Sequence, residues 1–182
     1  MEIHHPVVSM DGGQNHDGNT EGLVENEPAV IKHLISVAEA GNFFGINEMI
    51  NENQISQDAL KSPEVKAALG RGLVKYLQGY VNLDSTDISD LDIPDDVLAL
   101  PEVADAAQKC ILRFIKQGQM MAAKKVFADF YIPDDFIGSS EAQEAAKIGV
   151  EACRMHGEQG RIPAKEIIDK FNLPKALIWW RN

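Results

Sequence analysis

Apolar residues recur along most of the chain three and four positions apart, which is the spacing of one face of an α-helix. The pattern is clearest in three segments, at residues 63–77, 101–115 and 141–153. The apolar positions are Val65, Ala68, Leu69, Gly72, Leu73, Tyr76 and Leu77, then Val103, Ala106, Ala107, Cys110, Ile111, Phe114 and Ile115, and then Ala142, Ala145, Ala146, Gly149, Val150 and Cys153. No stretch alternates apolar and polar residues between turn signals. The sequence therefore predicts an all-helical protein.

The three segments are copies of one longer repeat. Proline opens the first two at Pro63 and Pro101, a spacing that gives a repeat of about 38 residues. The glutamate that follows each proline suits the helix dipole. An Ile-Pro-Asp-Asp sequence closes two copies, at Ile93–Asp96 and Ile132–Asp135, and Leu173–Leu177 resembles it. Proline ends the preceding element, and we expect the two aspartates to cap a short turn.

Small residues stand at matching places in each copy. Gly79, Gly118 and Gly157 follow the long apolar segments, and we expect them to end a helix in the left-handed conformation. A small residue also interrupts each apolar stripe, at Gly72, Cys110 and Gly149. A small side chain at that place predicts a close approach of neighbouring helices.

A weaker copy precedes these three, since Gly41 stands one repeat length before Gly79. We therefore expect four helix-turn-helix units, at about residues 26–61, 62–99, 100–138 and 139–182. Residues 83–91 replace the second helix of the second unit with Asp, Ser and Thr, which favour turns. A helix pair cannot bury its apolar faces alone but stacked pairs can, so the repeat predicts a right-handed α-solenoid.

The two ends of the chain differ from the repeat. Residues 1–24 are polar and rich in glycine and asparagine, so we expect a disordered leader, with a partner-docking segment as the alternative. The helical repeat domain then covers residues 25–182. Both tryptophans, Trp179 and Trp180, lie at its end, where we expect them to cover the open end of the stack.

The charge balance limits the partners that the chain can bind. It has 28 acidic and 17 basic residues, a net charge of −11. This balance argues against direct nucleic-acid binding and against docking on an anionic membrane, and it favours a basic protein partner. The first ten residues lack the features of a secretory signal, and Cys110 and Cys153 lie inside predicted helices, so we expect a cytoplasmic protein with free thiols.

The densest charge in the chain lies in the connector of the second unit. It contains six aspartates: Asp84, Asp87, Asp90, Asp92, Asp95 and Asp96. We interpret them as the site for a basic partner, and a solvated connector is the simpler alternative. A calcium site is a third reading, although the ligand spacing of an EF-hand loop is absent.

No pattern in the sequence predicts a catalytic, cofactor or metal site. His4 and His5 are adjacent, but no His-x-x-x-His pair falls on a helix, and the two cysteines lack metal-ligand spacing. No nucleophile elbow or phosphate-binding loop is present. We therefore expect a protein that is not an enzyme and needs no cofactor. Catalysis by residues distant in the sequence is the alternative left open.

The repeat resembles the tetratricopeptide and pentatricopeptide classes of helical hairpins, although its unit is longer. The residues that carry the resemblance are Ser62–Ala68, Gly79 and Phe130–Pro133, and the tetratricopeptide signature of Trp, Leu-Gly and Tyr is missing. The unit is also similar to repeats in uncharacterised bacterial proteins. The resemblance implies a fold and no activity, because pentatricopeptide proteins read RNA through a basic groove that this acidic chain is not expected to have.

These patterns together predict a non-catalytic protein-interaction module that binds a basic partner through an acidic helical-repeat surface. The alternative function is a nucleic-acid-mimicking inhibitor of a DNA- or RNA-binding protein, which uses the same electrostatics on a different partner. Cations on the helices are further candidates for partner contact: Lys75, Arg113, Lys116, Lys124, Lys125 and Arg154.

Overall fold

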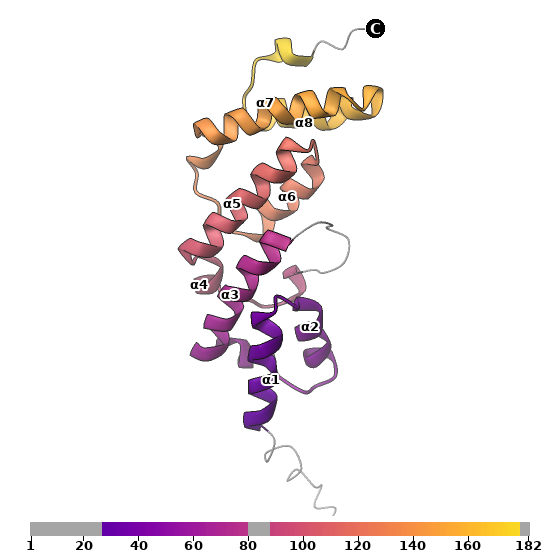
Figure 1. Ribbon diagram of the computed structural model, residues 1–182. Coiled ribbons are helices and arrows are strands. Elements are labelled where there is room, and N and C mark those ends of the chain that lie inside the picture. Colours follow the sequence, from indigo (N-terminus) through magenta and orange to yellow (C-terminus); the bar gives the residue numbers. More distant parts are fainter. Residues whose placement is uncertain (1–26, 80–87, 179–182) are drawn as a thin grey trace, which may run out of the picture.

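The computed structural model describes residues 27–79 and 88–178 of the chain, and within these ranges every regular element is a helix (Figure 1). The α-helices are α1 (Glu27–Glu39), α2 (Phe43–Asn51), α3 (Pro63–Gly79), α4 (Asp95–Leu98), α5 (Pro101–Lys116), α6 (Met120–Asp129), α7 (Ser140–Arg154) and α8 (Arg161–Lys170). Four short 3-10 helices lie between them, η1 (Gln57–Lys61), η2 (Ile88–Asp90), η3 (Phe136–Gly138) and η4 (Gly157–Gly160), and a fifth, η5 (Lys175–Ile178), follows α8. The all-helical prediction is confirmed for this part of the chain.

The long helices begin where the sequence pattern predicts. Pro63 and Pro101 are the first residues of α3 and α5. An amide at the first position of a helix has no carbonyl partner within the helix, so proline, which lacks the amide proton, loses no hydrogen bond there. Before α7, the Ser139 hydroxyl accepts a bond from the Ala142 amide at 3.2 Å, and Asn42 caps α2 in the same way. Local signals therefore account for the start of each of these helices.

Neighbouring helices pack in the order of the chain. Helix α1 packs on α3, α3 on α5, and α5 on α7, and a second helix lies beside three of them: α2 on α1, α6 on α5 and α8 on α7. Figure 1 shows α3, α5 and α7 following one another up the molecule, each with its amino-terminal end on the left. The predicted apolar stripes supply most of the buried core between these helices.

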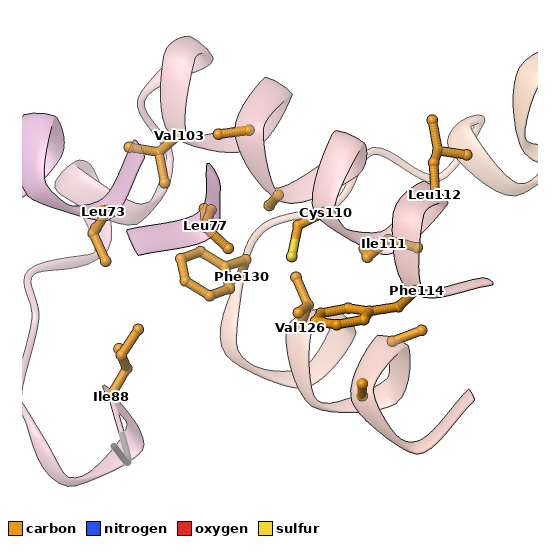
Figure 2. Packing of buried hydrophobic residues seen from close by; sticks show 14 of the residues in the cluster. Leu73, Leu77, Ile88, Val103, Cys110, Ile111, Leu112, Phe114, Val126 and Phe130 are labelled. Carbon is orange, nitrogen blue, oxygen red and sulfur yellow. The ribbon is translucent and has the colours of Figure 1, made fainter. Parts of the chain in front are cut away.

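The second unit has no long second helix in its described part. Helices η2 and α4 stand between α3 and α5, which agrees with the Asp, Ser and Thr content of that segment. Ile88 and Leu91 are buried there, and Figure 2 places Ile88 in the same cluster as Leu77 of α3 and Phe130. The short segment therefore still contributes apolar side chains to the core.

Two glycines allow neighbouring long helices to touch through their backbones. A Cβ atom added to Gly72 of α3 stands 1.8 Å from the Ala38 carbonyl oxygen of α1, and one added to Gly149 of α7 stands 2.1 Å from the Ile115 carbonyl oxygen of α5. Both distances are far inside van der Waals contact. The predicted close approach is confirmed at these two places.

The helix-ending glycines are not all alike. Gly118 and Gly157 have φ angles of 72° and 58°, and Gly41 has 74°, so all three are left-handed. The prediction is wrong for Gly79, which is the last residue of α3 and whose φ lies outside the left-handed region. The end of α3 is completed in another way, by the side chain of Arg113 described below.

Several predictions concern residues beyond the described ranges. The expected leader at residues 1–24 and the two tryptophans lie outside them. Leu177, just before the tryptophans, packs against the core, and its carbonyl oxygen accepts a bond from Arg154. No helix in the described ranges combines the length and the apolar content that a membrane crossing needs.

Candidate functional site

Four of the six predicted connector aspartates are described, and all four side chains are exposed: Asp90, Asp92, Asp95 and Asp96. Asp84 and Asp87 lie outside the described residues. Asp96 forms an ion pair with Lys66 of α3 at 2.8 Å, and its bond from the Lys66 ammonium lowers the pKa of the Asp96 carboxyl. The connector is therefore tied to α3 at one of its carboxylates.

The aspartates that follow Pro94 do not occupy the cap position, so the prediction is wrong on that point, although backbone hydrogen bonds at Asp96 and Val97 help to lower the pKa of the Asp96 carboxyl. Asp95 and Asp96 are the first two residues of α4. The N-cap position before the helix is occupied by Pro94. Their charges lie in the first helical turn, where the helix dipole favours an anion. In the corresponding Asp134–Asp135 pair, Asp135 precedes η3 but makes no capping bond with its side chain.

The structure brings acidic residues from several units to one side of the molecule. The amino-terminal ends of α3, α5 and α7 lie on the left in Figure 1, together with α4 and η3. Eight carboxylates on these ends and on the connectors before them form what we name the acidic edge: Glu64, Asp92, Asp95, Asp96, Glu102, Asp134, Asp135 and Glu141. All eight side chains are exposed, so the edge is open to solvent.

Few cations offset the acidic edge. Lys66 pairs with Asp96, and Lys109 pairs with Asp105 at 2.7 Å, while Glu141 adds a weaker electrostatic effect on Lys109. The pKa of Lys61 is raised first by its bond to Asp58 and least by the charge of Asp92. Within the described ranges, Asp96 is the one carboxylate of the edge that forms an ion pair, and the other seven form none.

A groove of about 270 Å³ lies between α3 and α5 and borders the acidic edge at Glu102. Its apolar lining is Val74 and Leu77 of α3 with Ala106 and Cys110 of α5. Its polar lining is Gln78, Glu102, Asp105, Lys109 and Arg113. Asp105 is paired with Lys109, so the groove combines an apolar wall with one carboxylate that forms no ion pair, Glu102, which suits the long side chain of a lysine or arginine.

Cys110 explains why the groove lies at this interface. It occupies the place in α5 that Gly72 occupies in α3 and Gly149 in α7, one repeat length away in each direction. A side chain at Gly72 or Gly149 would collide with a carbonyl oxygen of the preceding helix. The Cys110 side chain therefore prevents an equally close approach of α5 to α3.

Most of the predicted cations are already engaged within the chain. Arg113 donates to the carbonyl oxygens of Gln78 and Leu77 at 2.8 and 3.1 Å, and Lys75 donates to that of Glu39 at 2.8 Å. Lys75 and Arg113 hold the same place in successive repeats, so each neutralises the end of the preceding long helix. Arg154 bonds to the Leu177 carbonyl, and Lys124 pairs with Glu166 at 2.9 Å.

The two cysteines lack the setting of a reactive thiol. Cys110 and Cys153 are buried and free, and burial raises the pKa of both thiols. The Arg113 guanidinium opposes this effect at Cys110 but does not outweigh it. A protonated thiol is a weak nucleophile and a weak metal ligand. Within the described ranges, no three His, Cys, Asp or Glu side chains gather closely enough to hold a metal ion.

The prediction from sequence covered only part of the acidic edge. It selected the connector of the second unit, because the density of aspartate is highest there. It missed Asp134 and Asp135 of the next unit, although they repeat Asp95 and Asp96 one repeat length later. That spacing was the available signal. The groove had no such signal, because its walls come from two helices.

Comparison of the chain with protein-family models, curated proteins and solved structures returned no match. The geometry and charge of the chain itself therefore carry the functional proposal below.

Proposed function

We propose that this chain is a non-catalytic protein-interaction module that binds a basic segment of a partner protein along the acidic edge. The observation that carries the proposal is the gathering of eight exposed carboxylates from three successive units, seven of them without an ion pair in the described part of the chain. Cations of a partner gain most where carboxylates are close together and not yet neutralised.

The fold that we infer for this function is an α-solenoid of four units, for which a right-handed sense remains a prediction. The packing order α1, α3, α5, α7 supports it, as do the glycine contacts that recur after two units at Gly72 and Gly149. Stacked units present equivalent positions side by side, so one acidic residue per unit becomes a row. The tetratricopeptide-like resemblance of the repeat agrees with this arrangement.

The groove between α3 and α5 provides the anchoring point of the proposed site. An arginine or lysine of the partner lays its apolar stem on Val74 and Ala106 and directs its cation to Glu102, which forms no ion pair in the described ranges. Burial of one such side chain gives specificity that a row of exposed charges does not provide.

The nucleic-acid-mimicking alternative receives less support from the charge distribution. The described residues hold 21 of the 28 acidic side chains and 16 of the 17 basic ones, so this part of the chain is close to balanced. Eight of these 21 acidic residues form a single edge, whereas a mimic of a duplex needs charge over a wide surface. We place the module in the cytoplasm, where the two free thiols stay reduced.

The test compares two variants with the same change of net charge. In the first, Asp92→Lys and Asp134→Lys reverse two exposed positions of the acidic edge that lie outside the helices. In the second, Glu48→Lys and Asp169→Lys reverse two exposed residues on α2 and α8. The probe is a synthetic peptide of about 12 residues with alternating lysine and alanine, titrated against each full-length protein and followed by backbone NMR shifts.

We expect the edge variant to bind the peptide at least about tenfold more weakly than wild type, and the control variant to lose less than about threefold. Peptide-induced shifts should concentrate on α4, η3 and the first turns of α5 and α7. Equal weakening of both variants would mean that the peptide senses only the net charge, and the acidic edge would then be rejected as a site. Binding of duplex DNA at the same residues would contradict a site that selects basic partners.

A further inference from the structure

A second surface, on α6 and α8, has the opposite chemistry to the acidic edge. Met121 and Ile162 are the second residues of these helices, and their side chains are 73% and 72% exposed. Four cations lie next to them or one turn later, namely Lys124, Lys125, Arg161 and Lys165. We name these six residues the α6/α8 patch.

Two contacts place the exposed apolar residues at the same end of the two helices. Lys124 in the middle of α6 pairs with Glu166 in the middle of α8, and the Lys170 ammonium near the end of α8 lies 4.7 Å from the Phe127 ring centre near the end of α6. Both contacts join equivalent places along the two helices, so α6 and α8 run parallel. Met121 and Ile162 therefore lie at the same end of the α6/α8 pair.

An apolar residue at this place needs an explanation beyond helix formation. The first turn of a helix favours acidic or small polar residues, and a large apolar side chain gains nothing from solvent there. The first residue of α6 is Met120, which is buried, and the first residue of α8 is Arg161. The second residue is exposed and apolar in both helices. The pairing of two such positions on adjacent helices is typical of a contact surface.

The charges around the patch define what it contacts. Lys124 pairs with Glu166, Arg161 lies 3.7 Å from Glu158, and Lys125 also has an interaction partner within the chain. Lys165 has no ion pair within the described ranges. The preceding residues Gln119 and Gly160 make no capping bond with their side chains, so the positive ends of both helix dipoles face the same region.

We propose that the α6/α8 patch binds an acidic amphipathic segment of a partner protein. Its apolar side chains pack on Met121 and Ile162, and its carboxylates meet Lys165 and Arg161. This surface is separate from the acidic edge, and the proposal does not depend on the proposed function. With both surfaces in use, the chain connects a basic partner to an acidic one.

The matching position of α2 supplies an internal control. Phe44 is also the second residue of its helix and is 56% exposed, but Asn42 caps α2 with a 3.0 Å bond and Glu48 lies one turn on. Phe44 thus has the apolar character of the patch without its positive surroundings. A carboxylate-bearing segment has no reason to choose α2.

The experiment titrates two peptides of about 15 residues, each with leucines three and four positions apart, against the full-length protein. One peptide has glutamates on its polar face and the other has lysines. The test variant is Met121→Gln with Ile162→Gln, and the control is Phe44→Gln with Ile148→Gln, which removes comparable exposed apolar surface elsewhere. A third variant, Lys165→Glu, tests the charge, and the edge variant Asp92→Lys with Asp134→Lys tests independence.

We expect the glutamate peptide to bind wild type and both the Phe44/Ile148 and edge variants alike, and to bind the Met121/Ile162 variant about tenfold more weakly. Lys165→Glu should also weaken it. Equal affinity for the two peptides would overturn the charge argument, and an unchanged Met121/Ile162 variant would overturn the apolar one. Vesicles containing phosphatidylserine form a separate arm, and binding to these through Met121 and Ile162 without peptide binding would assign the patch to a membrane surface and reject our proposal.

Discussion

The α5–α7 and α3–α5 interfaces use the same repeat position in different ways. In the first, Gly149 allows the Ile115 carbonyl oxygen to within 2.1 Å of where a Cβ atom would stand. In the second, Cys110 fills the equivalent place and a groove of about 270 Å³ opens beside it. The two interfaces therefore differ at this repeat position by the side chain of one cysteine: with glycine the helices are in close contact, and with cysteine a candidate binding groove lies between them.

The helix ends at the two interfaces also differ. Gly118 ends α5 in the left-handed conformation, close to Cys153 of α7. At the end of α3, Gly79 is not left-handed, and Arg113 of α5 supplies bonds to two open carbonyls instead. The position that matches Arg113 in α7 is Ala152, so α7 has no such side chain to offer. The groove interface is thus held by a charged side chain where the closed one is held by backbone contact.

The largest effect should come from filling the closed interface. Gly149→Ala places a methyl group against the Ile115 carbonyl, and neither helix backbone yields easily. We expect the free energy of unfolding, measured by urea denaturation, to fall by about 3 kcal/mol. Gly79→Ala is the control, because nothing lies within 4 Å of its added Cβ atom. It should change stability by less than about 1 kcal/mol. Similar losses in both variants would remove the distinction between the interfaces.

A smaller effect should follow from removing the charged side chain of the groove interface. Arg113→Met keeps an apolar stem but leaves the Leu77 and Gln78 carbonyls without their donor. We expect a loss of about 1.5 kcal/mol. Lys75→Met removes a single exposed bond at the α1–α3 interface and should cost below about 1 kcal/mol. The reverse order in urea denaturation would show that Arg113 does not hold the end of α3.

The labelling rates of the two thiols should show which of the two interfaces is more accessible to a reagent. Burial raises the pKa of Cys110 and Cys153, so both stay protonated at neutral pH and react slowly with a disulfide reagent in the folded protein. Cys110 lines the groove, whereas Cys153 packs beneath the Gly118 backbone. We therefore expect Cys110 to be labelled several times faster, as measured by peptide mass spectrometry. Faster labelling of Cys153 would place the more open interface between α5 and α7.

The smallest effect concerns the ion pair beside the groove interface. The Lys66 ammonium lowers the pKa of Asp96 from its ordinary value of 3.8. A lowered pKa in the folded state stabilises the protein above the ordinary carboxyl pKa, and this gain disappears as the pH falls through the lowered pKa. Lys66→Met should therefore lower the unfolding free energy slightly at neutral pH and not at all in strong acid. Because both side chains are solvent-accessible, salt should shrink the difference.

Much of the fold could be predicted because its signals are local. Pro63 and Pro101 mark helix starts, and the stripe from Val65 to Leu77 marks a buried face, with only Tyr76 partly exposed. Caps, prolines and three-to-four spacing act within one or two helical turns. The prediction failed at Gly79 because the residue that completes the end of α3, Arg113, belongs to the next long helix.

The candidate site was predicted less completely than the fold. The sequence by itself determined which residues are acidic and that Asp95–Asp96 and Asp134–Asp135 occupy matching places in the repeat. Only the tertiary structure decided that these pairs share an edge with Glu102, that Cys110 leaves a groove, and that Met121 and Ile162 lie at the same end of α6 and α8. Each of these facts depends on the distance in space between residues of successive repeats, and that distance is set by how closely neighbouring helices pack.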